Sequence, residues 1–262
     1  TMAVRTCQRI EYGDKSFGST YQEQAKMFRK WYIEQYRRYC EKWSRTTNAY
    51  FKDALIKNYI YKSPTLEWYM RIKCRMDGYY DIWDRLIPRD ATITDMGCGY
   101  GQMSFMLALL SADRTVLGID YDSEKIDQCN HSFLSKNKNI KFLCADSRTV
   151  DIPQSDVILF SDSLHYVDAN SQYDILKRAI SSLKENGMII VRDSDNSKKE
   201  EHEKIAKCEF WSTRIIKFNK TTTELTFVNQ QWMKDFALEN NMKIETYNCG
   251  KDSSEILYIL TK

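Results

Sequence analysis

Three glycines stand at alternate positions in the stretch DMGCGYG, residues 95–101, directly behind an aspartate. Gly97, Gly99 and Gly101 let the main chain turn sharply and let a ligand approach where no Cβ stands in the way. A glycine run by itself is weak evidence, because it serves dinucleotides as well as other adenosyl ligands. Asp95 favours an adenosyl ligand with a cationic amino-acid group over a dinucleotide, since its carboxylate would attract the cation and repel a pyrophosphate.

Further polar side chains fall where strands are expected to end. Asp120 closes TVLGID about twenty residues on, where an acidic side chain accepts hydrogen bonds from two ribose hydroxyls. Tyr121 beside it can lie against an adenine face. Asp146 closes IKFLCAD, where its carboxylate suits the exocyclic amine of adenine. The next expected strand brings polar residues of FSDSLHYV to the same edge of the sheet: Ser161, Asp162 and His165.

Strands and helices that alternate from residue 91 onward must position these residues. Strands are expected at 91–96, 115–120, 140–146, 155–162 and 188–193. Helices are expected at 102–111, 123–135, 171–184 and 232–240, with Asn186-Gly187 as the C-cap of the third. Strands rich in Val, Ile and Leu that alternate with helices indicate a parallel sheet covered on both faces. Two final strands are joined by KDSS, a linker so short that they must be antiparallel.

The first 90 residues are predicted to be helical and basic. Aromatic residues spaced by three and four predict a long helix at 20–45, and further helices follow at 49–59 and from Pro64. Residues 1–90 hold 18 Lys and Arg against 11 Asp and Glu, whereas the whole chain holds 39 against 36. Such helices can contact an anionic membrane surface or lipid, or simply bury their aromatic side chains and expose their charges.

The motifs DMGCGYG, GIDYD, CAD, DVILFSDSLHYV and LKENGMIIVRD occur in this order along the chain. In order and spacing they resemble the successive motifs of class I S-adenosylmethionine-dependent methyltransferases, over about residues 91–262. The resemblance implies a Rossmann-like α/β fold with a mostly parallel seven-stranded sheet and an antiparallel C-terminal hairpin. It divides the chain into a helical N-terminal extension or lid, residues 1–90, and a methyltransferase domain, residues 91–262.

Residue by residue, the resemblance implies S-adenosyl-L-methionine as the cofactor. The positions it assigns to cofactor binding are Asp95, Gly97, Cys98, Gly99, Tyr100, Gly101, Asp120, Tyr121, Ala145, Asp146, Ser147 and Ser161. The implied reaction is methyl transfer by in-line displacement to a small-molecule acceptor that is lipid-like or aromatic, for which alignment of the reacting atoms is the main requirement.

A hydroxyl acceptor would also need a base, and His165 is the best-placed catalytic candidate, with Asp162 as the second. Asp193 could line the acceptor pocket, and capping or packing roles stay open for all three residues. The inner face of the lid is expected to carry Tyr61, Trp68 and Tyr69, with core packing as the alternative.

The stretch SPTLEWYMRIK and the whole layout also resemble the methyltransferase-like domains fused behind glycerolipid-type acyltransferases in some bacterial proteins. This second resemblance implies that the chain is part of a larger bacterial protein. The acceptor would then be a lipid, an aryl polyene or a resorcinol-like compound. A start at Thr1 and Met2 fits a domain cut from such a chain.

Composition places few limits on partners and compartment. With 42% hydrophobic and 29% charged residues, the chain reads as a soluble globular protein. Its eight cysteines are scattered without a CxxC pair, which indicates reduced thiols in the cytoplasm and no metal site. No nucleic-acid partner is expected, since SDSLHYV stands where a nucleic-acid methyltransferase would show an NPPY-like motif.

Two readings from other classes stay open beside methyl transfer. A nicotinamide-dependent reductase would use a Tyr-xxx-Lys pair, which occurs as Tyr173 with Lys177 and as Tyr69 with Lys73, both at the wrong distance from the glycines. A non-catalytic module would keep the cofactor fold as a binding domain of a larger lipid-modifying protein. A comparison of S-adenosylmethionine binding with NADPH binding distinguishes a methyltransferase from the reductase. Binding of S-adenosylmethionine without turnover would favour the non-catalytic module.

Overall fold

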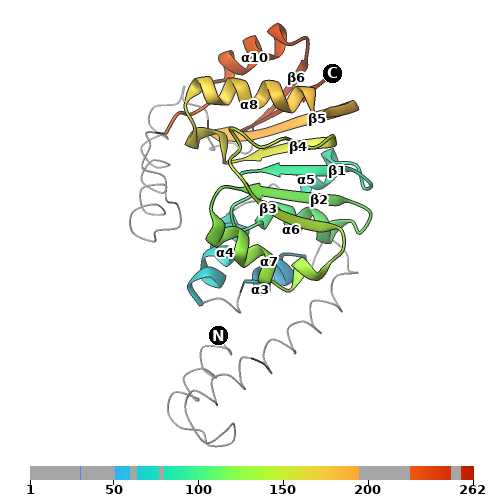
Figure 1. Ribbon diagram of the computed structural model, residues 1–262, viewed down its shortest axis with the longest axis vertical. Coiled ribbons are helices and arrows are strands. Elements are labelled where there is room, and N and C mark those ends of the chain that lie inside the picture. Colours follow the sequence, from blue (N-terminus) through green and yellow to red (C-terminus); the bar gives the residue numbers. More distant parts are fainter. Residues whose placement is uncertain (1–29, 31–50, 60–63, 77–79, 195–224, 249–254) are drawn as a thin grey trace, which may run out of the picture.

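The computed structural model describes residues 30, 51–59, 64–76, 80–194, 225–248 and 255–262. Within them, seven strands form one sheet in the order β3-β2-β1-β4-β5-β7-β6 (Figure 1). Apart from residue 30, the predicted helix at 20–45 lies outside the described residues, as do the start of the one at 49–59 and Tyr61.

The sheet has the predicted direction of every strand. The strands are β1 (Thr92–Met96), β2 (Thr115–Asp120), β3 (Ile140–Cys144), β4 (Ser155–Ser161), β5 (Leu183–Ser194), β6 (Lys243–Asn248) and β7 (Glu255–Thr261). β1 to β5 pair in parallel, and β7 is antiparallel to both of its neighbours, β5 and β6. The mostly parallel sheet with an antiparallel C-terminal hairpin is therefore confirmed.

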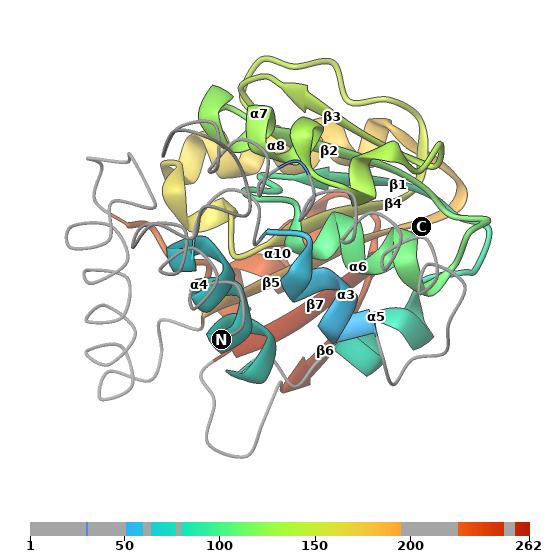
Figure 2. The same ribbon diagram turned by 90° about the horizontal axis from the view of Figure 1, so that it is seen from below.

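Helices cover both faces of the sheet. They are α3 (Phe51–Lys57), α4 (Pro64–Met76), α5 (Tyr80–Leu86), α6 (Gln102–Leu110), α7 (Ser123–His131), α8 (Ala169–Ser181) and α10 (Gln230–Glu239), with 3₁₀ turns η2 (Leu134–Lys136) and η3 (Leu164–Tyr166). Figure 2 shows α3 to α6 in front of one face, with α8 and α10 on the other. Among the described helices, none is long and apolar enough to cross a bilayer.

α6 is the helix around which the N-terminal helices gather. All eight of its residues from Met103 to Leu110 are buried, and Phe105 and Met106 are fully so. A helix that is apolar on every side must be enclosed on every side. α3 and α5 supply that cover, since Leu55 and Trp83 belong to the same buried cluster as Phe105. The division at residue 90 stays a prediction, but α3, α5 and the sheet share one core.

A buried arginine fixes α5 to the start of β1. Arg114 has a fully buried side chain and lies just before β2. Its guanidinium pairs with the Asp84 carboxylate at 2.7 Å and donates to the carbonyls of Pro88 at 3.0 Å and Ile87 at 2.5 Å. Because a buried cation needs all of its donors satisfied, these bonds set where β1 begins relative to α5.

The predicted boundary between the third helix and the fifth strand is wrong. The helix expected at 171–184 ends at Ser181, and β5 begins at Leu183 rather than at residue 188. Between the pairs Ser155–Leu183 and Val157–Met188 the register of β4 and β5 shifts, which marks a bulge in β5. Asn186 has φ 60° within that bulge. Asn186 thus adopts its left-handed conformation in a bulge of β5, and Asn186-Gly187 does not end a helix.

Candidate functional site

The glycine loop between β1 and α6 depends on backbone conformations that favour glycine. Gly97, Gly99 and Gly101 have φ values of 74°, 57° and 73°. A Cβ on Gly97 would lie 2.4 Å from the Cβ of Ser163, and one on Gly101 would lie 2.8 Å from the Phe142 ring. A Cβ on Gly99 would meet nothing within 4 Å. Two of the glycines therefore permit close packing, and Gly99 presents bare main chain to open space.

Asp120 at the end of β2 holds this loop. Its carboxylate accepts the N–H of Gly99 at 2.8 Å and the N–H of Asp122 at 2.9 Å, and the side chain is buried. The Ile119 carbonyl accepts the N–H of Gly97 at 2.8 Å. A carboxylate has about four acceptor positions, so Asp120 retains capacity for hydroxyl donors.

Asp95 at the end of β1 is a buried carboxylate beside the loop. It is 1% exposed, and the Ser104 hydroxyl donates to it at 2.5 Å. Burial raises the pKa of Asp95 to about 6; the Ser104 hydrogen bond opposes this shift, and the nearby charge of Asp120 adds to it. The ionised form is therefore costly here, and a bound cation would stabilise it.

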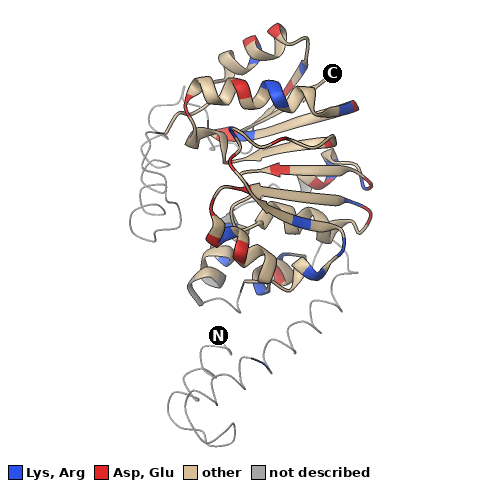
Figure 3. Ribbon diagram, in the orientation of Figure 1, with Lys and Arg blue, Asp and Glu red and all other residues tan. Residues whose placement is uncertain are grey.

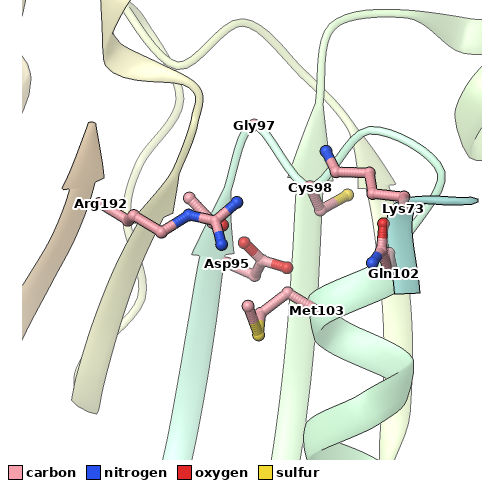
Figure 4. A pocket seen from close by; sticks show the side chains of 8 residues that line it. Lys73, Asp95, Gly97, Cys98, Gln102, Met103 and Arg192 are labelled. Atoms are coloured by element: carbon pink, nitrogen blue, oxygen red, sulfur yellow. The ribbon is translucent and has the colours of Figure 1, made fainter. Parts of the chain in front are cut away.

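A cavity opens between the loop and the ends of β4 and β5 (Figure 4). About 340 Å³ of space lies between its walls, a figure that includes volume open to solvent. In Figure 4 the Arg192 guanidinium points toward Asp95, and Lys73 on α4 reaches in above Cys98. The lining residues are Lys73, Asp95, Gly97, Cys98, Gln102, Met103, Ser161 and Arg192.

Asp162, just beyond β4, is held by two cations. The buried Arg192 guanidinium pairs with its carboxylate, and the Lys73 ammonium lies 3.9 Å from it. Burial alone would raise the pKa of Asp162, but the charges of Arg192 and Lys73 outweigh it and lower the pKa to about 2. Asp162 adopts φ 55°, and its N–H donates to the Arg192 carbonyl at 3.0 Å. A carboxylate with so low a pKa is a poor proton acceptor at neutral pH.

His165 in η3 forms a buried pair with Asp193 at the end of β5. The two side chains are 5% and 1% exposed, and the His165 Nδ1 lies 2.8 Å from the Asp193 Oδ1. The imidazole also packs at a tilt against the rings of Tyr166 and Phe227, with ring centroids 4.3 Å and 5.1 Å away. A carboxylate at Nδ1 orients the ring. Figure 3 shows acidic positions gathered at this edge, where the parallel strands end.

The end of β3 differs from the expectation. β3 ends at Cys144, so Asp146 lies two residues beyond the strand. Its carboxylate is held by Arg148, with the shortest contact at 2.6 Å, and the hydrogen bond from Arg148 lowers the pKa of Asp146. Arg178 on α8 donates to the carbonyl of Ser147, which fixes the loop behind it. Tyr121, which follows β2, is 52% exposed.

The structure brings several predicted residues together and adds others. Four predicted cofactor residues line the cavity: Asp95, Gly97, Cys98 and Ser161. Gln102 and Met103 follow the glycines directly and could have been inferred from that position. Lys73 and Arg192 could not, because only tertiary folding brings both to Asp162.

Other predicted residues lie elsewhere. Tyr61 and the side chain of Trp68 are outside the described part of the chain. Tyr69 is half-buried and packs against the core around α6. Tyr173 on α8, of the Tyr-xxx-Lys pair, donates to the Glu239 carboxylate on α10. No group of three or more metal-binding side chains occurs within the described ranges.

Comparison with known sequences points to one class of domain. Residues 93–187 match a family described as a methyltransferase domain. A carboxy-S-adenosyl-L-methionine synthase of Helicobacter hepaticus is 27% identical over 106 residues, 40% of this chain and 44% of that protein. The enzyme of the same name from Campylobacter concisus is 20% identical over 148 residues, 53% of this chain and 63% of that one. The chain thus spans about half the length of the curated relatives it matches.

Solved structures share the fold at low sequence identity. Human N-acetylserotonin methyltransferase in complex with S-adenosylmethionine has a TM-score of 0.56 and 15% identity, covering 92% of this chain and 68% of that one. An O-methyltransferase family protein of Burkholderia thailandensis has a TM-score of 0.56 and 14% identity, covering 90% and 70%. The chain therefore shares the Rossmann-like fold of these methyltransferase structures, and its residues 93–187 match the methyltransferase domain family.

Proposed function

We propose that this protein binds S-adenosylmethionine and transfers its methyl group to a small lipid-like or aromatic acceptor. One observation carries the proposal: the glycine loop follows Asp95 and is held by Asp120 through the Gly99 N–H, so two buried carboxylates at the ends of adjacent parallel strands flank its start. Crevices at this edge of open α/β sheets are where such folds bind ligands.

The charges in the cavity suit the amino-acid end of this cofactor. Asp95 supplies a carboxylate for an ammonium group, and Lys73 and Arg192 supply cations for a carboxylate, all lining one space. Asp120 would accept the ribose hydroxyls with the capacity that Gly99 and Asp122 leave. The exposed ring of Tyr121 would lie against the adenine, with Ala145, Asp146 and Ser147 at its edge.

The cofactor supplies a methyl group already activated by a sulfonium, so the chain mainly needs to align and to exclude water. Ser161 and Arg192 at the ends of β4 and β5 line the same space as the glycine loop. If the methyl group goes to a hydroxyl, His165 would take up the hydroxyl proton, with Asp193 orienting its ring. Asp162, with its pKa of about 2, holds Arg192 and Lys73 in place and does not take up the proton.

The test is mass spectrometry of the small molecules retained by the purified protein, followed by calorimetric titration. We expect S-adenosylmethionine or its demethylated product to be retained and S-adenosylmethionine to bind. Binding of NADPH in its place would refute the proposal. Cofactor binding without methylation across lipid and aromatic acceptors would instead support a non-catalytic domain of a larger lipid-modifying protein.

A second candidate is a reaction with a carboxylated cofactor. The relatives from Helicobacter hepaticus and Campylobacter concisus are named as carboxy-S-adenosyl-L-methionine synthases. Arg192 favours this candidate, because a guanidinium that is 2% exposed and lines the cavity suits an additional carboxylate on the ligand. The same mass spectrum decides: a retained cofactor heavier by one carbon dioxide supports this candidate, and the unmodified mass supports simple methyl transfer.

A further inference from the structure

Two buried phenols from outside the matched region hold the glycine loop. Tyr59 lies two residues beyond α3, Tyr80 begins α5, and both precede residue 93, where the match begins. We propose that Tyr59 and Tyr80 are positioning residues that keep the loop in its cofactor-binding shape. The inference rests on the proposed function, and it makes the N-terminal helices part of the cofactor site.

Tyr59 acts on the main chain of the loop. Its hydroxyl donates to the carbonyl of Tyr100 at 2.7 Å, and its ring packs edge-on against Phe105 at 6.2 Å. Burial, with the neighbouring thiols of Cys129 and Cys74, raises the pKa of Tyr59 well above its usual value. The hydroxyl therefore keeps its proton and remains a donor at every pH near neutrality.

The bond from Tyr59 fixes one peptide plane at the end of the loop. The carbonyl of Tyr100 and the N–H of Gly101 belong to the same planar peptide unit. That N–H donates to the Cys98 carbonyl at 2.8 Å, so both polar groups of the plane are held. Rotation of this plane would change the backbone of Gly101, which precedes α6 with φ 73°. Tyr59 thus fixes the far end of the glycine turn.

Tyr59 is itself held rigidly. Its neighbour Asn58 is fully buried, and the Asn58 Oδ1 accepts the N–H of Leu134 in η2 at 3.0 Å. Consecutive residues at the end of α3 thereby reach two separate segments, the glycine loop and the connection between α7 and β3. Because Asn58 is anchored, the hydroxyl of Tyr59 cannot follow the loop if the loop shifts.

Tyr80 acts on the side chain that follows the loop. Its hydroxyl accepts a hydrogen bond from the Gln102 amide and donates to the Cys74 thiol at 3.6 Å. Tyr80 is 2% exposed, whereas Gln102 lines the cavity. The phenol therefore ties one wall of the cavity to α4 and α5.

A loop that is ordered before its ligand arrives does not have to be ordered on binding. Loss of one buried hydrogen bond that maintains this order should weaken binding about three- to tenfold. A tyrosine-to-phenylalanine change removes the hydroxyl and keeps the ring, so the packing against Phe105 survives.

The experiment compares Tyr59→Phe and Tyr80→Phe with Tyr258→Phe in the full chain. Tyr258 is fully buried on β7, in the cluster on the opposite face of the sheet, so its change controls for removal of a buried hydroxyl. We expect the Kd for S-adenosylmethionine to rise about three- to tenfold in the first two variants and to stay unchanged in the third. Lower thermal midpoints with unchanged Kd in the first two would show a merely structural role and overturn the inference.

Hydrogen exchange without ligand separates the inference from the proposed function. We expect the amides of residues 97–102 to exchange faster in Tyr59→Phe than in wild type, and at the wild-type rate in Tyr258→Phe. Unchanged exchange in Tyr59→Phe would refute the positioning role whether or not the cofactor binds. Wild-type protein that binds no S-adenosylmethionine would refute the proposed function, with the exchange rates still deciding the role of Tyr59.

Discussion

A buried aspartate, Asp95, and a partly exposed one, Asp162, lie at the same sheet edge and have opposite pKa shifts. Asp95 at the end of β1 has a pKa raised to about 6, chiefly by burial. Asp162 beyond β4 is subject to the same effect of burial, yet Arg192 and Lys73 lower its pKa to about 2. In one half of the edge the Asp95 carboxylate accepts a hydrogen bond from the neutral Ser104 hydroxyl, and in the other half two cations already neutralise the Asp162 carboxylate.

This contrast assigns different work to the two halves. An incoming cation would relieve the cost of an ionised Asp95, so the loop side is prepared for a charged ligand group. On the β4–β5 side, Asp162 already has its partners, so that half maintains a fixed arrangement of side chains around Arg192. We therefore expect the loop side to bind a cationic ligand group, and the β4–β5 side to form a wall of the cavity.

The largest effect is expected from Asp95→Asn, which removes the buried charge and keeps the shape. The wild-type pKa of Asp95 is raised from 3.8 to about 6, so its contribution to stability is complete below about pH 4 and is lost as pH rises through 6. At pH 7 the ligand-free variant should be more stable by up to about 3 kcal/mol. Urea unfolding at pH 7 and pH 5 measures the gain, which should shrink at the lower pH.

The same variant should bind S-adenosylmethionine at least about tenfold more weakly at pH 7, since it cannot pair with an ammonium group. Wild-type affinity should also fall as pH drops below about 6, because protonated Asp95 must lose its proton to bind a cation. A variant that is both less stable and equally able to bind would contradict the proposed role of Asp95.

Asp162→Asn should change stability in the opposite direction. Asparagine tolerates φ 55° and fills the same volume, so the variant reports on the lost charge. Because ionised Asp162 stabilises the fold above about pH 4 and loses this effect as pH falls through 2, the variant should be less stable by about 2 kcal/mol at pH 7. Chemical unfolding measures the loss.

The control for Asp162 is the double variant Asp162→Asn with Arg192→Met. If the loss comes from an uncompensated buried guanidinium, replacing Arg192 by an apolar side chain of similar length should recover part of it. A double variant that is less stable than the single one would show that Arg192 contributes mainly through contacts other than Asp162.

Asp120→Ala tests the loop side through its second carboxylate. The change removes the acceptor for ribose hydroxyls and releases the N–H of Gly99. The binding free energy of S-adenosylmethionine should therefore weaken by at least about 1.5 kcal/mol, so that its Kd rises more than tenfold. Isothermal titration measures it, with Asp174→Ala on the exposed side of α8 as a control of equal charge. An unchanged Kd in Asp120→Ala would count against the whole cofactor assignment.

The loop side was largely predictable from the sequence because its determinants are local. Gly97, Gly99 and Gly101 all have positive φ, as alternating glycines between a strand and a helix suggest. Asp95 and Asp120 lie within strands whose apolar residues define where they end. Backbone conformation and strand ends are properties of a few consecutive residues, and a motif can record them.

The other half depends on contacts that no local pattern records. Lys73 and Asp162 are brought together from α4 and the end of β4, and His165 meets Asp193 across two strand ends. The sequence placed His165 and Asp193 at one edge but could not show that they form a hydrogen bond. It misplaced the start of β5 because Asn186-Gly187 is equally suited to a bulge and to a helix end.

Asp146 belongs by its motif to the cofactor-loop side of the edge. Its carboxylate is nevertheless paired with an arginine, as that of Asp162 is on the β4–β5 side. Arg148 holds its carboxylate, which must be shared or released if Asp146 is to accept the adenine amine. The pair is largely exposed, and such pairs contribute about 0–1 kcal/mol. Arg148→Ala should therefore strengthen binding of S-adenosylmethionine by no more than about 0.5 kcal/mol, a twofold lower Kd at most.

Titration calorimetry at low salt can resolve this small change when Lys141→Ala serves as the reference. Lys141 is an exposed cation on β3, so its removal changes the net charge equally and leaves Asp146 with Arg148. A twofold gain confined to Arg148→Ala would mean that the ion pair competes with the ligand for Asp146. A clear loss of affinity would mean that Arg148 itself contacts the cofactor. Charged side chains would then form the adenine end of the site, as Asp162 and Arg192 form the β4–β5 side.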